Sequence, residues 1–360
     1  MNPANESETS VEEPQAQAQP RRGMLEEGAV VLLLTLLMLQ SISLLYGQAP
    51  MEVFRALFEG TWGTGYGIGQ VLFKTTPLIF TGLSVAVAFR AGLFNVGAEG
   101  QSVLGALAMG WLGTILPATL HTPLGIGLCL LAGAMAGAFW GGLAGVLKAT
   151  FKAHEVITTI MLNFLAMALS SYLLVNFWAV KDTLHTSALG EGLTLPRFEA
   201  SVTALQGSAL NFAFPLALLM VGGVWVVLFR LTFGFELRTL GLSPGAAHYS
   251  GLNTAGLEIK ALALAGALAG LVGANFVLGY KHYYEEGFSG GVGFLGIAVA
   301  LLGRAHPLGV VFAALFFGTL QQGGLAVNAL IPKDSMDVLQ AVVIFAVAGA
   351  SGRSLLRRGA

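Results

Sequence analysis

The sequence predicts an all-α fold, that of a polytopic membrane protein with about ten transmembrane helices. Composition is the first reason: 55% of the 360 residues are hydrophobic and only 10% are charged, whereas soluble domains carry about 25% charged residues. The mean hydropathy of +0.75 agrees. The second reason is that apolar stretches recur along the chain, each close to or above the roughly 20 residues that a spanning helix needs. They begin near Ala29, Val71, Leu93, Leu124, Ile157, Phe214, Ile259, Phe288, Leu308 and Val338.

The two ends of the chain differ from this apolar region. Residues 1–27 are polar, acidic and rich in Pro, Gln and Ala. Such a composition cannot bury a core, so we expect a disordered cytoplasmic tail. The first apolar run, Ala29–Leu45, follows basic residues as in a signal peptide, but no convincing cleavage pattern comes after it, so we expect a retained helix. The transmembrane domain is therefore predicted over 28–352, and a basic cytoplasmic tail over 353–360.

Basic residues indicate the orientation, because cytoplasmic loops of membrane proteins carry an excess of Lys and Arg. With the N-terminus inside and spans alternating, twelve of the 18 basic residues fall inside and six fall outside or at outer helix ends. The inner set is Arg21, Arg22, Arg90, Lys148, Lys152, Arg230, Arg238, Lys260, Arg304, Arg353, Arg357 and Arg358. The outer set is Arg55, Lys74, Lys181, Arg197, Lys281 and Lys333. An even number of spans keeps the basic tail inside, so the prediction is N-in and C-in.

Composition and motifs also argue against several functions. The net charge of −1 lacks the basic footprint of a nucleic-acid-binding protein. The single cysteine, Cys129, permits no intrachain disulfide and is not a metal site by itself. Residues 291–296 match G-x-G-x-x-G, but no predicted strand precedes them and no Walker A sequence occurs. No cluster of His, Asp or Glu indicates an enzyme, so we expect neither a catalytic residue nor a metal or cofactor.

Two connections are longer than the others. Residues 180–213 are predicted to form an external segment, and residues 231–258 the longest cytoplasmic loop. Within that loop, Ser243-Pro244 is a helix start signal with proline at the first helical position. Gly251 fits a C-terminal stop. The resulting short helix, parallel to the membrane, is either a docking surface or a simple interfacial connector.

Glycines at four-residue spacing occur in two of the predicted spans. Gly133, Gly137, Gly141 and Gly145 form one bare stripe, and Gly266 and Gly270 repeat the spacing. Such stripes let two helix backbones approach closely. Ordinary helix packing is favoured over a special role in helices that rock, because the chain has 49 glycines.

Amide and acidic residues inside apolar spans are the candidate functional residues, because they are costly in hydrocarbon and normally face a bundle interior or a hydrated path. Several lie next to an aromatic residue, a combination suited to a neutral polar solute with flat apolar faces, such as a nucleoside or a sugar. The alternative is that each amide only joins helices. Glu99, flanked by Gly97 and Gly100, is predicted to hold a helix break or to pair with Arg90. The predicted path residues are Phe94, Asn95, Glu99, Gln101, Asn163, Phe164, Asn275 and Gln321.

Four stretches carry a resemblance to a known family. Residues 81–101, TGLSVAVAFRAGLFNVGAEGQ, resemble the signature of permease subunits in bacterial ABC importers of the branched-chain amino acid and simple-sugar type. Residues 154–164, HEVITTIMLNF, are similar to the nucleoside and simple-sugar subgroup, as are residues 237–253 and 293–318. Together the four stretches span most of residues 70–325.

The resemblance implies an importer of the bacterial inner membrane that is assembled from several proteins. The implied partners are a cytoplasmic ABC ATPase, a second, paralogous permease subunit and an extracytoplasmic substrate-binding lipoprotein, with membrane lipid around them. In such importers the short cytoplasmic helix docks into the ATPase. The implied coupling residues are Arg238, Gly241, Ser243, Pro244, Ala246, Ala247 and Gly251.

We therefore expect the permease subunit of a nucleoside importer, with ATP hydrolysed by a partner and not by this chain. Import of a simple sugar such as ribose or galactose is the alternative within the class. An ion-coupled secondary transporter is a second alternative, which requires acidic or histidine residues deep in several spans, and only Glu99 is a serious candidate. An integral membrane enzyme would require a cluster of such residues at one depth.

Overall fold

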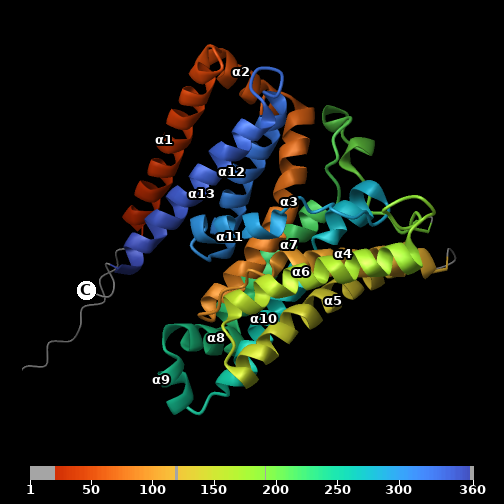
Figure 1. Cartoon of the computed structure of the whole chain (residues 1–360), viewed down its shortest axis with the longest axis vertical. Coiled ribbons are helices and arrows are strands. Elements are labelled where there is room, and N and C mark those ends of the chain that lie inside the picture. Colours follow the sequence, from red (N-terminus) through yellow and green to blue (C-terminus); the bar gives the residue numbers. More distant parts are fainter. Residues whose placement is uncertain (1–20, 118–120, 191, 357–360) are drawn as a thin grey trace, which may run out of the picture.

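The computed structural model describes residues 21–117, 121–190 and 192–356, and within them the fold is helical, with only isolated β-bridges (Figure 1). The helices of the first half are α1 (Arg21–Leu45), α2 (Pro50–Thr61), α3 (Gly65–Arg90), α4 (Ala98–Ile115), α5 (Thr122–Phe151) and α6 (Glu155–Leu173). Those of the second half are α7 (Ala213–Arg230), α8 (Thr232–Leu242), α9 (Pro244–Tyr249), α10 (Thr254–Gly270), α11 (Val292–Leu302), α12 (Pro307–Ala326) and α13 (Lys333–Leu356). Two π-helical turns, η1 (Leu174–Trp178) and η4 (Ala274–Lys281), continue α6 and extend the chain beyond α10.

Within the described residues, six helical segments are long and apolar enough to cross a membrane: α3, α5, α6 with η1, α7, α10 with η4, and α12. A seventh appears if α1 and α2, bent by 118°, are counted as one span. The prediction of a polytopic helical membrane protein is confirmed, but this count is lower than ten. The expected spans near Leu93, Phe288 and Val338 are not among these segments. In the one near Phe288, the 11 residues of α11 extend only about 17 Å at 1.5 Å per residue, against a hydrocarbon core of about 30 Å.

The stretch expected to begin a span near Leu93 is interrupted. Residues 91–97 are not helical, Gly92 has a φ of 72°, and α4 begins at Ala98 with 18 residues. The predicted helix break beside Glu99 is therefore present. Backbone groups freed by such a break must be satisfied by the protein or by water, and the site described below shows how the protein does so.

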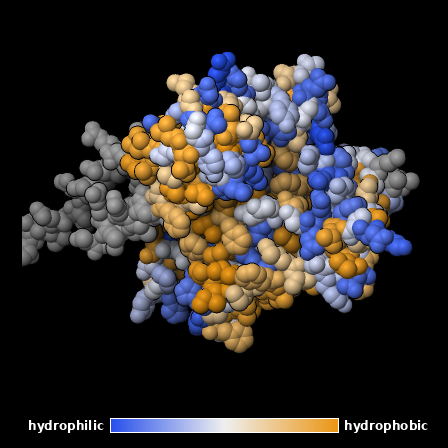
Figure 2. Space-filling view, turned by 45° about the horizontal axis from the view of Figure 1, so that its top comes forward, coloured by the Kyte–Doolittle hydropathy of each residue, from blue (hydrophilic) through white to orange (hydrophobic). Residues whose placement is uncertain are grey.

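The helices divide into an inner and an outer set. Of the apolar window of α3, 89% is buried inside the protein, and for α10 with η4 the value is 78%. The same share is only 33% for α5 and 28% for α7, so these helices present much of their apolar surface outward. Figure 2 shows hydrophobic side chains gathered across the middle of one face, with hydrophilic ones towards its edges. Exposed apolar side chains of this kind fit a lipid environment.

The two glycine stripes pack against each other, which confirms the predicted close approach of a helix backbone and adds which two helices meet. A methyl group added at Gly137 would collide with the carbonyl oxygen of Gly266, and one added at Gly266 would collide with the carbonyl oxygen of Gly137. Gly141 likewise lies against the backbone of α10. Backbones that approach this closely require glycine on both helices, so the stripes join α5 to α10.

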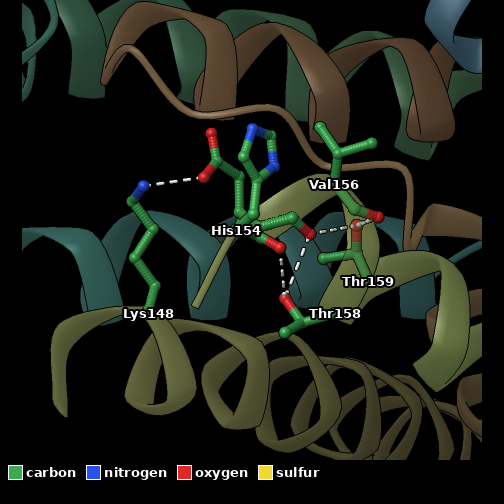
Figure 3. A network of polar contacts seen from close by, with 6 residues as sticks. Lys148, His154, Val156, Thr158 and Thr159 are labelled. Carbon is green, nitrogen blue, oxygen red and sulfur yellow. Dashed lines mark hydrogen bonds and ion pairs between the residues drawn. The ribbon is translucent and has the colours of Figure 1, made fainter. Parts of the chain in front are cut away.

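The turn between α5 and α6 is tight and held by polar contacts (Figure 3). Lys152 ends α5 in the left-handed conformation at φ 55°. Lys148 donates a hydrogen bond to the Glu155 carboxylate at 2.7 Å, and the Thr159 hydroxyl donates to the Glu155 carbonyl at 2.7 Å. The first residues of the 154–164 stretch therefore fix how α6 leaves the turn.

The ends and long connections differ in part from expectation. Residues 1–20 and 357–360 lie outside the described residues, and α1 begins at Arg21, before the expected start near Ala29. The segment 180–213 carries two 3-10 turns and isolated bridges, among them His185 to Glu285. In 231–258 the structure adds α8, an 11-residue helix that the sequence analysis did not predict.

Candidate functional site

Glu99, in the first turn of α4, is the centre of a buried polar network. It is 1% exposed, and its Oε2 accepts a hydrogen bond from the backbone N–H of Gly293 at 2.7 Å. Its Oε1 accepts a short hydrogen bond from the Ser289 hydroxyl. Negative charge is stabilised at helix N-termini, and this carboxylate lies at the N-termini of both α4 and α11. Arg90, the alternative partner, instead donates to the carbonyl of Ala305 at 2.9 Å.

Two amides hold the non-helical segment that precedes α4. The Asn95 side chain donates to Ser84 Oγ at 3.0 Å and exchanges hydrogen bonds with Gln101 at 2.9 and 3.1 Å. Its Oδ1 also accepts from the backbone N–H of Gly97 at 3.1 Å. Asn95 and Gln101 are both almost fully buried. The pair therefore ties α3, the segment 91–97 and α4 together.

Asn163 attaches the same segment to α6. Its Oδ1 accepts from the backbone N–H of Gly100 at 2.9 Å, and its Nδ2 donates to the carbonyl of Val96 at 2.9 Å. Buried amides that use both their donor and acceptor groups on backbone are typical of structural contacts between elements. A role of Asn95, Gln101 and Asn163 in a solute path remains a prediction.

The remaining predicted path residues lie apart from this network. Asn275, in η4, donates to the carbonyl of Phe73 at 3.2 Å and contacts the Asn211 side chain. The ring of Phe94 packs on Phe89 with centroids 4.9 Å apart. Phe164 is 64% exposed on the outer surface of α6. These three are not brought together with Glu99.

Gln321 lines a cavity of about 440 Å³ between α3, η4, α11, α12 and α13. The wall combines aromatic, amide and charged side chains. The polar and aromatic lining residues are Phe73, Lys74, Phe276, Ser289, Gln321, Lys333, Asp337 and Gln340. Of these the sequence analysis singled out only Gln321 as a site residue. Lys74 carried a usable signal, because an ionisable residue well inside an apolar span is itself a candidate for function.

Ser289 connects the cavity to the buried network. It lines the cavity, and its hydroxyl donates a hydrogen bond to the Glu99 carboxylate. Residues 289–292 enter α11 through Gly290 and Gly291, whose φ angles are +55° and +84°. The hydrogen bond from Ser289 therefore links the wall of the cavity to Glu99 at the N-terminus of α4.

The segment 231–258 contains α9, the short helix that the sequence predicted. The Ser243 hydroxyl accepts a hydrogen bond from the backbone N–H of Ala246 at 3.2 Å, Pro244 begins α9, and Gly251 has a φ of 80°. Ala247 is buried, whereas Leu242 and Tyr249 are 88% and 93% exposed. The sequence analysis did not name these two apolar side chains as site residues, because the composition of a helix does not show which of its side chains are exposed.

α8 rests on the ends of α3 and α7. A methyl group at Gly241 would collide with the Arg90 carbonyl oxygen and crowd the N–H of Gly92. The Arg238 guanidinium lies 5.2 Å from the centroid of the Phe229 ring, and the Arg90 guanidinium lies 5.6 Å from the same ring. Cation–π contacts of this kind contribute about 0.5–2 kcal/mol. α8 therefore contacts the ends of both α3 and α7 directly.

His306 lies against the same ring, with centroids 5.5 Å apart. Burial, followed by the nearby positive charge of Arg90, lowers the pKa of His306 below its ordinary value of 6.5. The imidazole is therefore held neutral beside two arginines.

This arrangement defines a class of protein. A helical membrane bundle with short helices meeting at a buried carboxylate, a polar cavity and an exposed helical loop at one end has the features of a solute permease. The chain belongs to the family of branched-chain amino acid transport system permease components, which matches residues 67–348. It is thus a multi-pass membrane permease subunit and not itself an enzyme.

Three characterised relatives illustrate the similarity. The chain is 37% identical over 313 residues to a guanosine ABC transporter permease protein of Bacillus subtilis, covering 85% of this chain and 88% of the relative. It is 34% identical over 313 residues to a nucleoside ABC transporter permease protein of Lactococcus lactis, covering 85% and 86%. A glucose ABC transporter permease protein of Haloferax volcanii is 33% identical over 305 residues, covering 82% and 79%. No solved structure matches significantly.

Proposed function

We propose that this chain is the permease subunit of an ABC importer in a bacterial inner membrane and forms the translocation path for nucleosides. The observation that carries the proposal is the 37% and 34% identity to guanosine and nucleoside permeases over 85% of the chain. The cavity beside Gln321 supports it, because aromatic and amide groups together suit a solute with flat faces and hydrogen-bonding edges.

The same comparisons support the proposed partners. Two guanosine permeases of Bacillus subtilis match, at 37% and 25% identity, and two nucleoside permeases of Lactococcus lactis match, at 34% and 27%. In each pair the chain is more similar to one member, so we place a second, paralogous permease beside it. A cytoplasmic ABC ATPase and an extracytoplasmic substrate-binding lipoprotein complete the importer.

We further propose ten passes, with both termini in the cytoplasm. In this topology two passes are made by a short helix together with a non-helical segment: 91–97 with α4, and 282–291 with α11. Buried hydrogen bonds to Glu99 and Asn163 satisfy backbone groups of these passes, as an irregular segment inside a membrane requires. The cavity then lies in the outer half, and α8 and α9 lie in the cytoplasm.

The cytoplasmic end is the proposed point of attachment of the ATPase. The proposed coupling residues remain Arg238, Gly241, Ser243, Pro244, Ala246, Ala247 and Gly251. The exposure of Leu242 and Tyr249, at 88% and 93%, supports docking over a simple connector, because a docked ATPase would cover this apolar surface. Gly241 and Arg238 would pass the movement of the ATPase to α3 and α7.

The proposed solute path begins at the cavity and passes Ser289 towards the network around Glu99. Its residues remain Phe94, Asn95, Glu99, Gln101, Asn163, Phe164, Asn275 and Gln321. Gln321 has the strongest support because it lines the cavity, and Glu99 follows because it bonds a residue of the cavity wall.

The test is uptake by the reconstituted importer, with the ATPase, the second permease and the binding protein present. We expect ATP-dependent accumulation of radiolabelled guanosine and none without the ATPase. Uptake of glucose in place of nucleosides would support the alternative suggested by the Haloferax relative. Accumulation driven by a proton or sodium gradient without ATP would overturn the proposal in favour of a secondary transporter.

A further inference from the structure

The cavity between α3, η4, α11, α12 and α13 is positively charged. Its charged lining residues are Lys74 of α3 with Lys333 and Asp337 of α13. Lys74 and Lys333 lie close enough to repel each other, and neither forms an ion pair with an acidic side chain in the part of the chain that the structure describes. Two neighbouring ammonium groups in a partly apolar cavity are costly, so an occupant that presents hydrogen-bond acceptors is favoured.

The rest of the lining provides a flat apolar surface and groups that both donate and accept. Phe73 and Phe276 meet edge to face with centroids 5.8 Å apart, and both line the cavity. Gln321 and Gln340 add amides from two different helices. An amide can donate or accept, whereas a lysine ammonium can only donate. Among the charged lining groups, the two lysines can therefore only donate, and Asp337 when ionised can only accept.

Nucleobases fall into two groups by the exocyclic group that they present on the edge facing the major groove of DNA. We expect the lysines to meet this edge. Guanine and thymine present a carbonyl oxygen there, whereas adenine and cytosine present an amino group. An ammonium group can bind the carbonyl oxygen but not the amino group, and the lining has two such groups against the single carboxylate of Asp337. The volume of about 440 Å³ lies within the range of small-molecule sites.

We propose that this cavity is a solute site of the permease and that Lys74 and Lys333 make it prefer nucleosides with a carbonyl-bearing base, such as inosine, guanosine and uridine, over adenosine and cytidine. The inference rests on the proposed function, since it assumes that a nucleoside enters this chain. It adds the class of base and the residues that select it. Inosine and adenosine are a matched pair for the test, because both are purine ribosides that differ at one exocyclic group.

The experiment uses the full-length chain in lipid nanodiscs and a cysteine reporter. Ala341 lines the cavity and is exposed, so Ala341→Cys can be labelled by a membrane-impermeant maleimide. The native Cys129 is fully buried, so we expect little labelling of it. The unsubstituted chain is labelled in parallel to measure this background. Ser201→Cys, exposed on the segment 180–213, is the control reporter outside the cavity.

We expect inosine to slow labelling of Ala341→Cys at concentrations about tenfold lower than adenosine, as for one well-placed base contact, and neither to slow labelling of Ser201→Cys. Adding Lys74→Met or Lys333→Met should reduce or abolish the preference while adenosine still protects, which also shows that the variant is folded. Lys181→Met, exposed and outside the cavity, should leave the preference intact.

Three results would overturn the inference: no labelling of Ala341→Cys without solute, no protection by either nucleoside, or equal protection by both. A preference that persists in both lysine variants would also overturn the assigned roles. Nucleoside uptake by the complete importer is measured separately. Normal uptake without protection would remove only this inference, whereas absence of any nucleoside uptake would remove the proposed function.

Discussion

The Glu99 carboxylate accepts a hydrogen bond from the backbone N–H of Gly293 at 2.7 Å, although the two residues are 194 positions apart. The contact brings together the N-termini of α4 and α11, each of which follows a non-helical segment. A methyl group at Gly293 would collide with the Glu99 backbone, so glycine is required there for the approach. The Glu99 carboxylate thus accepts a hydrogen bond from a free backbone N–H at the N-terminus of α11, within a largely apolar interior.

Replacement of Glu99 by glutamine should destabilise the protein. Glutamine keeps the size but offers one carbonyl oxygen in place of two acceptor oxygens. If that oxygen accepts from the Gly293 N–H, the amide nitrogen faces Ser289, whose oxygen can accept from it but whose hydroxyl proton loses its acceptor. An unsatisfied buried polar group costs about 1–3 kcal/mol. We expect a lower Tm of the detergent-purified chain. Glu286→Gln, on an exposed outer residue, is the control, and equal Tm values for both variants would contradict the role of Glu99.

Gly137→Ala should separate α5 from α10. The added methyl group meets the carbonyl oxygen of Gly266, whereas alanine at an unhindered helical position usually stabilises. We expect a loss of about 1–3 kcal/mol, typical of overpacking, seen as a reduced yield of folded protein and a lower Tm. Gly127→Ala is a matched control on α5, because nothing lies within 4 Å of a methyl group there. If both variants behaved alike, close packing at Gly137 would not be important.

The helical class, the glycine stripes and the helix of residues 244–249 could be predicted because each leaves a local pattern in the sequence. Hydropathy marks spans, spacing marks stripes, and Ser243-Pro244 marks a helix start. The count of spans was less accessible, since the apolar stretch near Phe288 contains an 11-residue helix preceded by a glycine-rich turn. Composition does not distinguish a short apolar helix from one that is long enough to span the membrane.

Individual residues of the candidate site could be predicted, but not the contacts between them. Glu99 and the amides stood out because polar groups in apolar spans are costly, but their partners could not be read from the chain. The contact of Glu99 with Ser289 depends on how α4 meets α11. The cavity could not be predicted either, because Lys74 of α3 and Lys333 and Gln340 of α13 come from helices far apart in the sequence.

Acidification should weaken the end of the bundle that holds His306. The pKa of His306 is lowered by burial and by Arg90, so the folded state favours the neutral ring. The resulting stability is present above the unfolded value of about 6.5 and is lost as the pH falls below it. We expect the Tm of the wild type to fall more steeply than that of His306→Gln between about pH 6.5 and 5. His248→Gln, on an exposed residue, is the control, and identical pH profiles for wild type and His306→Gln would contradict this account.

Gly251→Val should uncouple uptake from ATP hydrolysis. Gly251 has a φ of 80° and open space around it, so a side chain meets no clash but strains the backbone by about 1–2 kcal/mol. The chain leaving α9 would then turn differently and shift the exposed Leu242 and Tyr249 away from the ATPase. In the reconstituted importer we expect normal insertion, a Tm lowered by no more than a few degrees, ATP hydrolysis no longer stimulated by substrate, and uptake reduced at least about tenfold. Gly222→Ala, at an open position on α7, should transport normally. Full uptake by Gly251→Val would show that α9 does not transmit the work of the ATPase, because a docking helix cannot change its exit angle and keep its fit.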